Sequence, residues 1–378
     1  MKVSLSSLLH IVTAVSLAIN VENAHGLSAS VATTTTTTSG TFSSLPSLAD
    51  FNYHENSRLP YLEEGYGGTW KWQGHDINYL ELGDPSNPPL LLIHGFGASV
   101  YHFRYNIPNL ARNYHVYAFD LLGFGGSSKP IQEYGPQVWR DQTLDFIEQI
   151  IQRPTAVAGN SLGGFTALYA ASSEAGKKLI TSCISLNGAG RFRDPETETT
   201  DVDQSIAKEE EKNMMMSNFF QGLKRALERF VIGLSFIYTK QPARIEQVLR
   251  QVYPVNADNV DAELVRSIQL PSFDPNAPEV FYRVITKTAG ASVTIDDCLE
   301  TLECPLLLCW GEQDPWIRSA AADRMQLLYP AASRISIDAG HCPHDEAPQA
   351  VNDAIRQFIA STTMTTTARA TATSTQEQ

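Results

Sequence analysis

Short runs of apolar residues that alternate with helical patterns constrain the fold of this chain most strongly. Between about residues 65 and 360, six runs have the continuous apolar character of strands buried on both faces, and segments with helical spacing lie between them. The runs are 90–93, 116–119, 155–158, 180–186, 306–310 and 335–337, and residues 70–72 and 77–82 precede them as an expected antiparallel pair. This order predicts an α/β fold, with a mostly parallel central sheet covered by helices on both faces.

The interval 191–300 interrupts the alternation, because it shows helical spacing without a buried strand. It follows the fourth buried run and is rich in methionine and phenylalanine. Such side chains suit an adaptable apolar pocket, although apolar residues at helical spacing more often pack into a helix's own core. We therefore expect a helical cap at 191–300, inserted into a core formed by residues 61–190 and 301–360.

The two ends of the chain resemble segments outside the fold. Residues 1–26 have the plan of a signal peptide, with Lys2, an apolar stretch at 8–19, and Ala24 and Gly26 before a cleavage point. Residues 27–60 form a Ser/Thr-rich leader that is either transit-like or disordered. Residues 361–378 have few large apolar side chains to offset the entropy cost of ordering, so we expect a disordered tail.

Composition excludes several classes of protein. The formal net charge of −13 argues against a nucleic-acid partner, which requires a basic face. No uninterrupted apolar run reaches the roughly 18 residues of a conventional membrane span. The five cysteines include no C-x-x-C pair, so we expect neither a disulfide framework nor a zinc site.

The most specific motif is G-N-S-L-G-G at residues 159–164. It follows an apolar run and precedes a helix-prone segment, which is the strand–turn–helix context that the G-x-S-x-G pattern requires. A side chain at Gly159 or Gly163 would crowd the backbone of this strained turn. The motif therefore predicts that Ser161 is a nucleophile held above the edge of the sheet.

A serine hydroxyl needs a base, and the base needs an orienting carboxylate. In the chain order that accompanies this motif, the acid follows a late strand and the histidine follows the last one. Asp314 is the expected acid, with Glu312 as its rival closer to the strand end. His341 is the expected base, and its competitor, His344, is interpreted as an outer or surface residue.

Two backbone N–H groups should stabilise the tetrahedral intermediate. We expect one from Leu162, directly after the nucleophile, and the other from Phe96, in the glycine-flanked loop after the first buried run. For contacts with a bound ligand the candidates are Phe96 again, Trp316 beside the expected acid, and Met215 and Phe219 in the cap.

Several motifs together resemble the pheophytinase-like branch of the α/β-hydrolases, found in plastids and cyanobacteria. They are residues 94–99 with 102–104, 120–125, 159–164, 310–316 and 340–348. The last, G-H-C-P-H-D-E-A-P, is the most specific, because generic hydrolases often keep only the Gly-His. The resemblance spans about residues 65–360 and implies an α/β-hydrolase fold with an inserted helical cap.

The resemblance also implies a carboxylic ester hydrolase that removes phytol from a chlorophyll-type pigment, with Ser161, His341 and Asp314 as the triad. It implies no cofactor, and its partner is a hydrophobic small-molecule ester, with peripheral contact at a membrane as a further expectation. A lipid esterase or acyltransferase with the same triad stays open, as does a receptor-like binder with very slow turnover. Haloalkane dehalogenases and epoxide hydrolases are disfavoured, because those relatives have Asp at the position of Ser161.

The leader bears on location. A signal peptide followed by a transit-like segment resembles the two-part leaders of algae with complex plastids, in which an aromatic residue or, less often, Leu follows the cut; here it is Leu27. We expect import into a plastid, with secretion or an endomembrane lumen as the alternative.

Overall fold

The computed structural model describes residues 57–63, 66–194, 229, 231–288 and 293–376, the last fourteen of these by their backbone alone. The predicted signal peptide, most of the leader, and the cap residues Met215 and Phe219 lie outside the described residues. No helix in the described part of the chain is long and apolar enough to cross a membrane.

The described residues contain one eight-stranded sheet with the order β1-β2-β4-β3-β5-β6-β7-β8. β2 pairs antiparallel with both β1 and β4, and all other neighbours are parallel. This confirms the predicted mostly parallel sheet, and each predicted run falls on a strand. The strands are β1 (Gly68–Trp72), β2 (His75–Leu82), β3 (Pro89–Ile93), β4 (His115–Phe119), β5 (Thr155–Asn160), β6 (Ile180–Leu186), β7 (Leu306–Gly311) and β8 (Ser333–Ile337).

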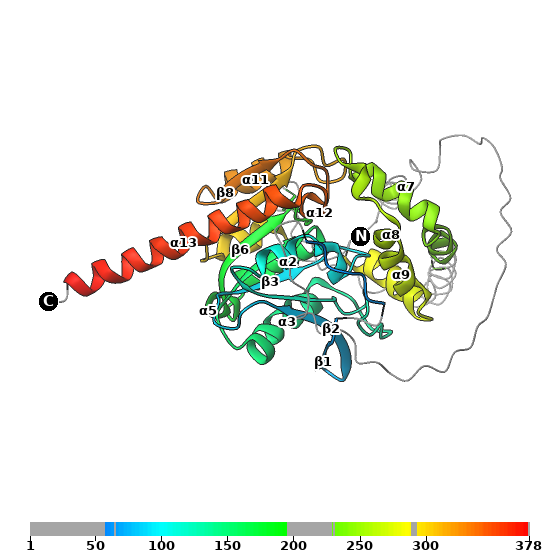
Figure 1. The fold of residues 1–378 in the computed structure, drawn as a ribbon, viewed down its shortest axis with the longest axis horizontal. Coiled ribbons are helices and arrows are strands. Elements are labelled where there is room, and N and C mark those ends of the chain that lie inside the picture. Colours follow the sequence, from blue (N-terminus) through cyan, green and yellow to red (C-terminus); the bar gives the residue numbers. More distant parts are fainter. Residues whose placement is uncertain (1–56, 64–65, 195–228, 230, 289–292, 377–378) are drawn as a thin grey trace, which may run out of the picture. The chain divides into compact units, whose positions relative to one another are not determined.

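Helices lie between the strands, as the alternation predicts (Figure 1). The core helices are η2 (Val100–Phe103), α2 (Asn106–Leu110), α3 (Pro136–Phe146), η3 (Ile147–Ile151), α4 (Leu162–Ser172), α5 (Gly176–Leu179), α10 (Ile295–Thr301), α11 (Ala320–Leu328), α12 (Pro343–Glu346) and α13 (Pro348–Gln376). Between β6 and α10 lie a helix at 231–239, then α7 (Pro242–Val252), η5 (Ala257–Asn259), α8 (Ala262–Gln269), η6 (Leu270–Phe273) and α9 (Ala277–Thr288).

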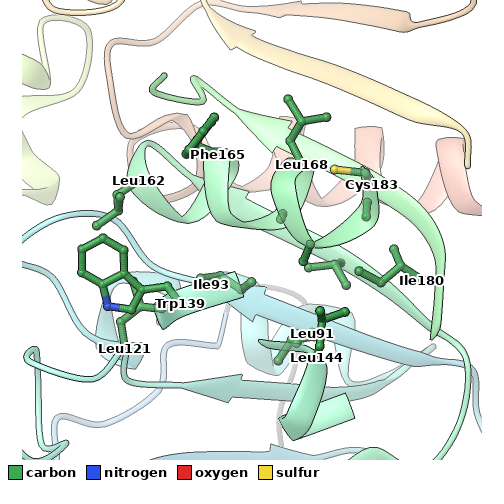
Figure 2. Packing of buried hydrophobic residues seen from close by; sticks show 14 of the residues in the cluster. Leu91, Ile93, Leu121, Trp139, Leu144, Leu162, Phe165, Leu168, Ile180 and Cys183 are labelled. Atoms are coloured by element: carbon green, nitrogen blue, oxygen red, sulfur yellow. The ribbon is translucent and has the colours of Figure 1, made fainter. Parts of the chain in front are cut away.

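Alternate residues of the central strands face two separate apolar clusters. Leu91 and Ile93 of β3 pack in one cluster with side chains of α3 and α4 (Figure 2). Leu90 and Leu92 pack on the opposite face, in a cluster that includes side chains of α2 and α13. Because successive residues of a strand point to opposite faces, a continuous apolar run is required to cover both.

Two expected boundaries differ from the structure. We expected the cap to reach residue 300, but α10 packs against α4 and α11, and its Ile295 and Leu299 belong to the core cluster. We also expected disorder from residue 361, but α13 continues to Gln376. Residues 361–376 contain alanines and neither Gly nor Pro, so a helix already nucleated in the core can propagate through them.

A buried ion pair joins the cap to the core. Arg104 follows η2 and is fully buried, and its Nε donates to Asp345 Oδ1 of α12 at 2.8 Å. Its Nη1 contacts both carboxylate oxygens of Asp261, the N-cap residue of α8, at 2.9 Å. Tyr253, directly after α7, donates its hydroxyl to Asp345 Oδ2 at 2.9 Å. One guanidinium therefore bridges two carboxylates on separate parts of the fold.

Candidate active site

Four neighbouring strands end at one edge of the sheet, and each is followed by a polar residue. Ser161 follows β5, Asn187 follows β6, Asp314 comes three residues after β7, and His341 comes four residues after β8. These strands are parallel and adjacent, so their carboxyl ends meet at the same edge. Open parallel sheets commonly bind ligands at this edge.

Ser161 occupies a strained turn between β5 and α4. Its φ of 54° and ψ of −116° are unusual for a residue with a side chain. A Cβ at Gly159 would collide with the backbone of Gly163, and one at Gly163 would collide with the Ile93 carbonyl. The turn is fixed by bonds from Ser161 N–H to the Leu186 carbonyl at 3.0 Å and from Ala189 N–H to the Ser161 carbonyl at 2.9 Å.

Asp314 and His341 form a buried pair. Asp314 Oδ2 lies 2.7 Å from His341 Nδ1, and each residue is only 4% exposed. The other oxygen, Oδ1, accepts the backbone N–H groups of Trp316 at 2.7 Å and Ile317 at 3.0 Å. Burial acts to raise the pKa of Asp314, but the contact with His341 and these N–H donors outweigh it and hold the pKa below its usual value.

Two asparagines that the sequence analysis did not single out support this arrangement. Asn187 donates Nδ2 to Asp314 Oδ2 at 2.8 Å and accepts the Gly311 N–H at 2.7 Å. Its φ of 45° is one that Asn tolerates better than most residues. Asn160, next to Ser161, donates Nδ2 to the His341 carbonyl at 2.9 Å and so connects the Ser161 turn to the loop that carries His341. Their only sequence signal is a polar residue at the end of a buried run.

The alternative candidates for the acid and the base, Glu312 and His344, do not contact Asp314 or His341 through any described hydrogen bond. Glu312 is exposed and binds Arg334 and the Ser336 hydroxyl. Of the two placements expected for His344, the structure excludes the surface and shows a fully buried side chain, with its ring centroid 4.8 Å from that of His102. Burial lowers the pKa of His344 well below its usual value, which favours the neutral ring. Of the two candidate acids and two candidate bases, the structure brings only Asp314 and His341 together.

The loop that carries Phe96 approaches Ser161 from β3. A Cβ at Gly95 would lie 3.2 Å from the Ser161 Cβ, and Gly97 has a φ of 71° that favours glycine. Leu162 is the first residue of α4, so its N–H has no partner within the helix. Both expected N–H donors therefore belong to segments that adjoin Ser161.

A largely apolar pocket of about 390 Å³ opens over Ser161. Phe96 and Leu162 line it, and the remaining lining residues come from the first residue of α3, from α4, from the segment after β6, from α9 and from position 293 after it. These are Pro136, Phe165, Ala189, Gly190, Arg191, Val284, Ile285 and Val293. Trp316 is not among them, but its ring lies 5.0 Å from that of His341 and is 57% exposed.

The contact between Asp314 and His341 predicts how the stability of the protein changes at acid pH. The pKa of Asp314 is held below its usual 3.8 in the folded state, so the ionised carboxylate stabilises the fold fully at pH values above 3.8. This stabilisation is lost as the pH falls through the lower pKa of the folded state. The Asp314→Asn variant lacks this contribution. The difference in Tm between wild type and variant should be largest near neutral pH and shrink below about pH 4, as followed by circular dichroism. A difference that grew toward acid would contradict this assignment.

Comparison with known proteins identifies the family. A family model described as the alpha/beta hydrolase fold matches residues 88–348. Pheophytinase, chloroplastic, of Arabidopsis thaliana is 27% identical over 310 residues, which cover 72% of this chain and 61% of that protein. The chain thus spans about three fifths of that relative's length.

Two further relatives are similarly distant. Epoxide hydrolase 3 of Xenopus tropicalis is 24% identical over 302 residues, 76% of each chain. A solved structure of a membrane phospholipase A, described as a bacterial virulence factor, is 26% identical with a TM-score of 0.58, and the match covers 78% of this chain and 86% of that one. The chain belongs to the α/β-hydrolase family and is a hydrolase.

Proposed function

We propose that the chain is a carboxylic ester hydrolase in which Ser161 is the nucleophile, His341 the base and Asp314 the orienting acid. The observation that carries this proposal is the 2.7 Å contact between Asp314 and His341, at the sheet edge that presents Ser161 on its strained turn. An imidazole that donates Nδ1–H to a carboxylate keeps Nε2 as a proton acceptor.

The reaction then has two steps. The Ser161 hydroxyl attacks the ester carbonyl carbon while His341 Nε2 takes its proton, and the oxyanion accepts the N–H groups of Phe96 and Leu162. Collapse of this intermediate breaks the ester bond, and the imidazolium gives its proton to the departing alcohol. Water, deprotonated by His341, then attacks the acyl-enzyme, so that the carboxylic acid leaves and Ser161 recovers its hydroxyl.

A hydrophobic ester is the substrate class that the pocket favours. Its walls are mainly aliphatic and aromatic, and its volume of about 390 Å³ suits a small-molecule group. We propose the phytyl ester of pheophytin or chlorophyll, which the motifs and the similarity to Arabidopsis pheophytinase support. Phytol would be the departing alcohol, and the pigment would keep the acid.

A lipid ester is the second candidate. The similarity to a membrane phospholipase A favours it, because that protein shares the fold at comparable identity. We do not propose epoxide opening despite the Xenopus relative. The residue on the strained turn between β5 and α4 is Ser161, whereas epoxide hydrolases have Asp at this position.

Pigment chromatography distinguishes the two candidates. Protein that starts near Leu48 is incubated with pheophytin a and chlorophyll a, with Ser161→Ala as the control. We expect loss of phytylated pigment and release of phytol by the wild type alone. If the wild type leaves both pigments intact but cleaves a phospholipid or a p-nitrophenyl ester, the lipid esterase replaces the pigment enzyme.

We also propose that the protein acts in a plastid, to which a leader at residues 1–60 directs it. The chloroplast location in the name of the Arabidopsis relative and the two-part composition of the leader support this proposal. Retention in the secretory pathway of a fluorescent protein that carries residues 1–60 would contradict it.

A further inference from the structure

The loop that carries His341 is held against the first turn of chain after α7. His341 N–H donates to the carbonyl of Val252, the last residue of α7, at 3.1 Å. Gly340 lies so close that a Cβ would collide with the Val252 carbonyl and the Pro254 ring. Only glycine permits this approach, so the histidine loop and the cap segment 252–256 are in direct backbone contact.

A buried carboxylate fastens the same two segments together. Glu346, the last residue of α12, is 2% exposed. Its Oε2 accepts the Gly340 N–H at 2.5 Å, while its Oε1 accepts the N–H groups of Val255 at 2.7 Å and Asn256 at 2.9 Å. One oxygen therefore binds the residue before His341, and the other binds two residues of the cap.

The contacts suit an ionised carboxylate that acts on the backbone. A buried carboxylate is costly unless it is hydrogen-bonded, and charged hydrogen bonds of this kind are stronger than neutral ones. Asp314 contacts the imidazole ring, whereas the carboxylate of Glu346 accepts main-chain N–H groups from Gly340 and from the cap segment. Asp314 can thus fix the rotation of the ring, but Glu346 fixes the backbone from which the ring projects.

We infer that Glu346 is a positioning residue for catalysis, which locks the His341 loop to the cap and so makes the placement of the base depend on the cap. This inference rests on the proposed triad. A base displaced by about 1 Å can lose on the order of 100-fold in rate. Because His341 would serve both acylation and deacylation, a displaced base slows both steps, and kcat falls while KM changes little.

The Glu346→Gln variant tests the inference, because its amide has nearly the same shape but only one acceptor. If the amide oxygen faces the Gly340 N–H, the NH₂ group faces the N–H donors of Val255 and Asn256 and cannot accept them. In the reverse orientation, the NH₂ group faces the Gly340 N–H and cannot accept it. Either placement frees one segment. We expect kcat for p-nitrophenyl butyrate to fall about 10- to 100-fold per active site, with KM within about threefold of the wild type.

The active sites are counted by titration with a fluorophosphonate, and folding is followed by circular dichroism. Glu312→Gln is the matched control, since this exposed carboxylate contacts Arg334 and Ser336 and should leave kcat within about twofold. A lower Tm of Glu346→Gln with unchanged kcat per titrated site would overturn the inference, because it would give Glu346 a purely structural role.

Val255→Pro provides a second variant if Glu346→Gln does not fold. It removes one N–H donor to Glu346 and leaves the carboxylate in place, and the Val255 side chain is already 44% exposed. We expect kcat to fall about threefold to tenfold at unchanged KM, and an unchanged kcat would again overturn the inference. A failure of the proposed function can be distinguished from a failure of this inference. If the proposed function were wrong, Ser161 of the wild type would not react with the fluorophosphonate.

Discussion

Replacement of Ser161 by Ala is expected to lower kcat/KM for a simple ester by at least about 10⁴-fold. Under the proposed mechanism, the variant lacks the hydroxyl that forms the acyl-enzyme, whereas the pocket and the proposed N–H donors of Phe96 and Leu162 remain. These groups can still bind the ester and polarise its carbonyl, so slow attack by water is the residual reaction. Steady-state hydrolysis of p-nitrophenyl butyrate measures the loss.

The control for this variant is Ser336→Ala. Ser336 lies on β8 with an exposed side chain whose hydroxyl contacts Glu312, away from the pocket. It should retain wild-type kcat/KM within about twofold. If Ser161→Ala kept more than about a tenth of the wild-type activity, a different nucleophile would carry the reaction and the assignment of Ser161 would be wrong.

Replacement of Arg104 by Met is expected to lower the free energy of unfolding by about 3–5 kcal/mol. Methionine fills much of the same space but leaves the fully buried carboxylate of Asp345 without its cation. The carboxylate of Asp261 loses the same partner, which loosens the start of α8 from the core. Urea unfolding at neutral pH, followed by circular dichroism and fluorescence, measures the change.

An exposed pair provides the comparison. Arg250 contacts Glu246 at 2.9 Å one turn away on α7, with about half of each side chain exposed. Arg250→Met should cost about 0.5 kcal/mol or less, because water screens such pairs. Equal losses for the two variants would contradict the buried role of Arg104. The double variant Arg104→Met with Asp345→Leu should recover part of the loss, since no unpaired charge then remains at Asp345.

The sheet was predictable because its strands have a strong local signal. The runs at 90–93 and 306–310 are apolar at every position, and a strand covered on both faces requires that pattern. The short helix α12 was not predicted, because four residues are too few to show helical periodicity. The end of the cap was also misjudged, since the spacing of α10 is that of any amphipathic helix and does not reveal which surface it covers.

The candidate site was predictable where a residue type at a strand end has a chemical role of its own. Ser161, Asp314 and His341 belong to this group. The supporting contacts were not predictable, because they join residues far apart in sequence. Arg104 and Asp345 are separated by 241 positions, and both stood in motifs whose roles the sequence alone does not reveal. Asn160 and Asn187 act through backbone carbonyls and carboxylates whose positions depend on the completed sheet.

The strained turn at Ser161 also bears on when the chain can become reactive. Its φ of 54° is held by β5, α4 and the carbonyl at the end of β6, and its neighbour Asn160 bonds to His341 across 181 residues. A growing polypeptide that has just emerged from the ribosome has the serine but neither the later strands nor the histidine. Such a nascent chain cannot yet make the contact between Asn160 and the His341 carbonyl, so the arrangement around Ser161 is complete only once the whole sheet has been synthesised and folded.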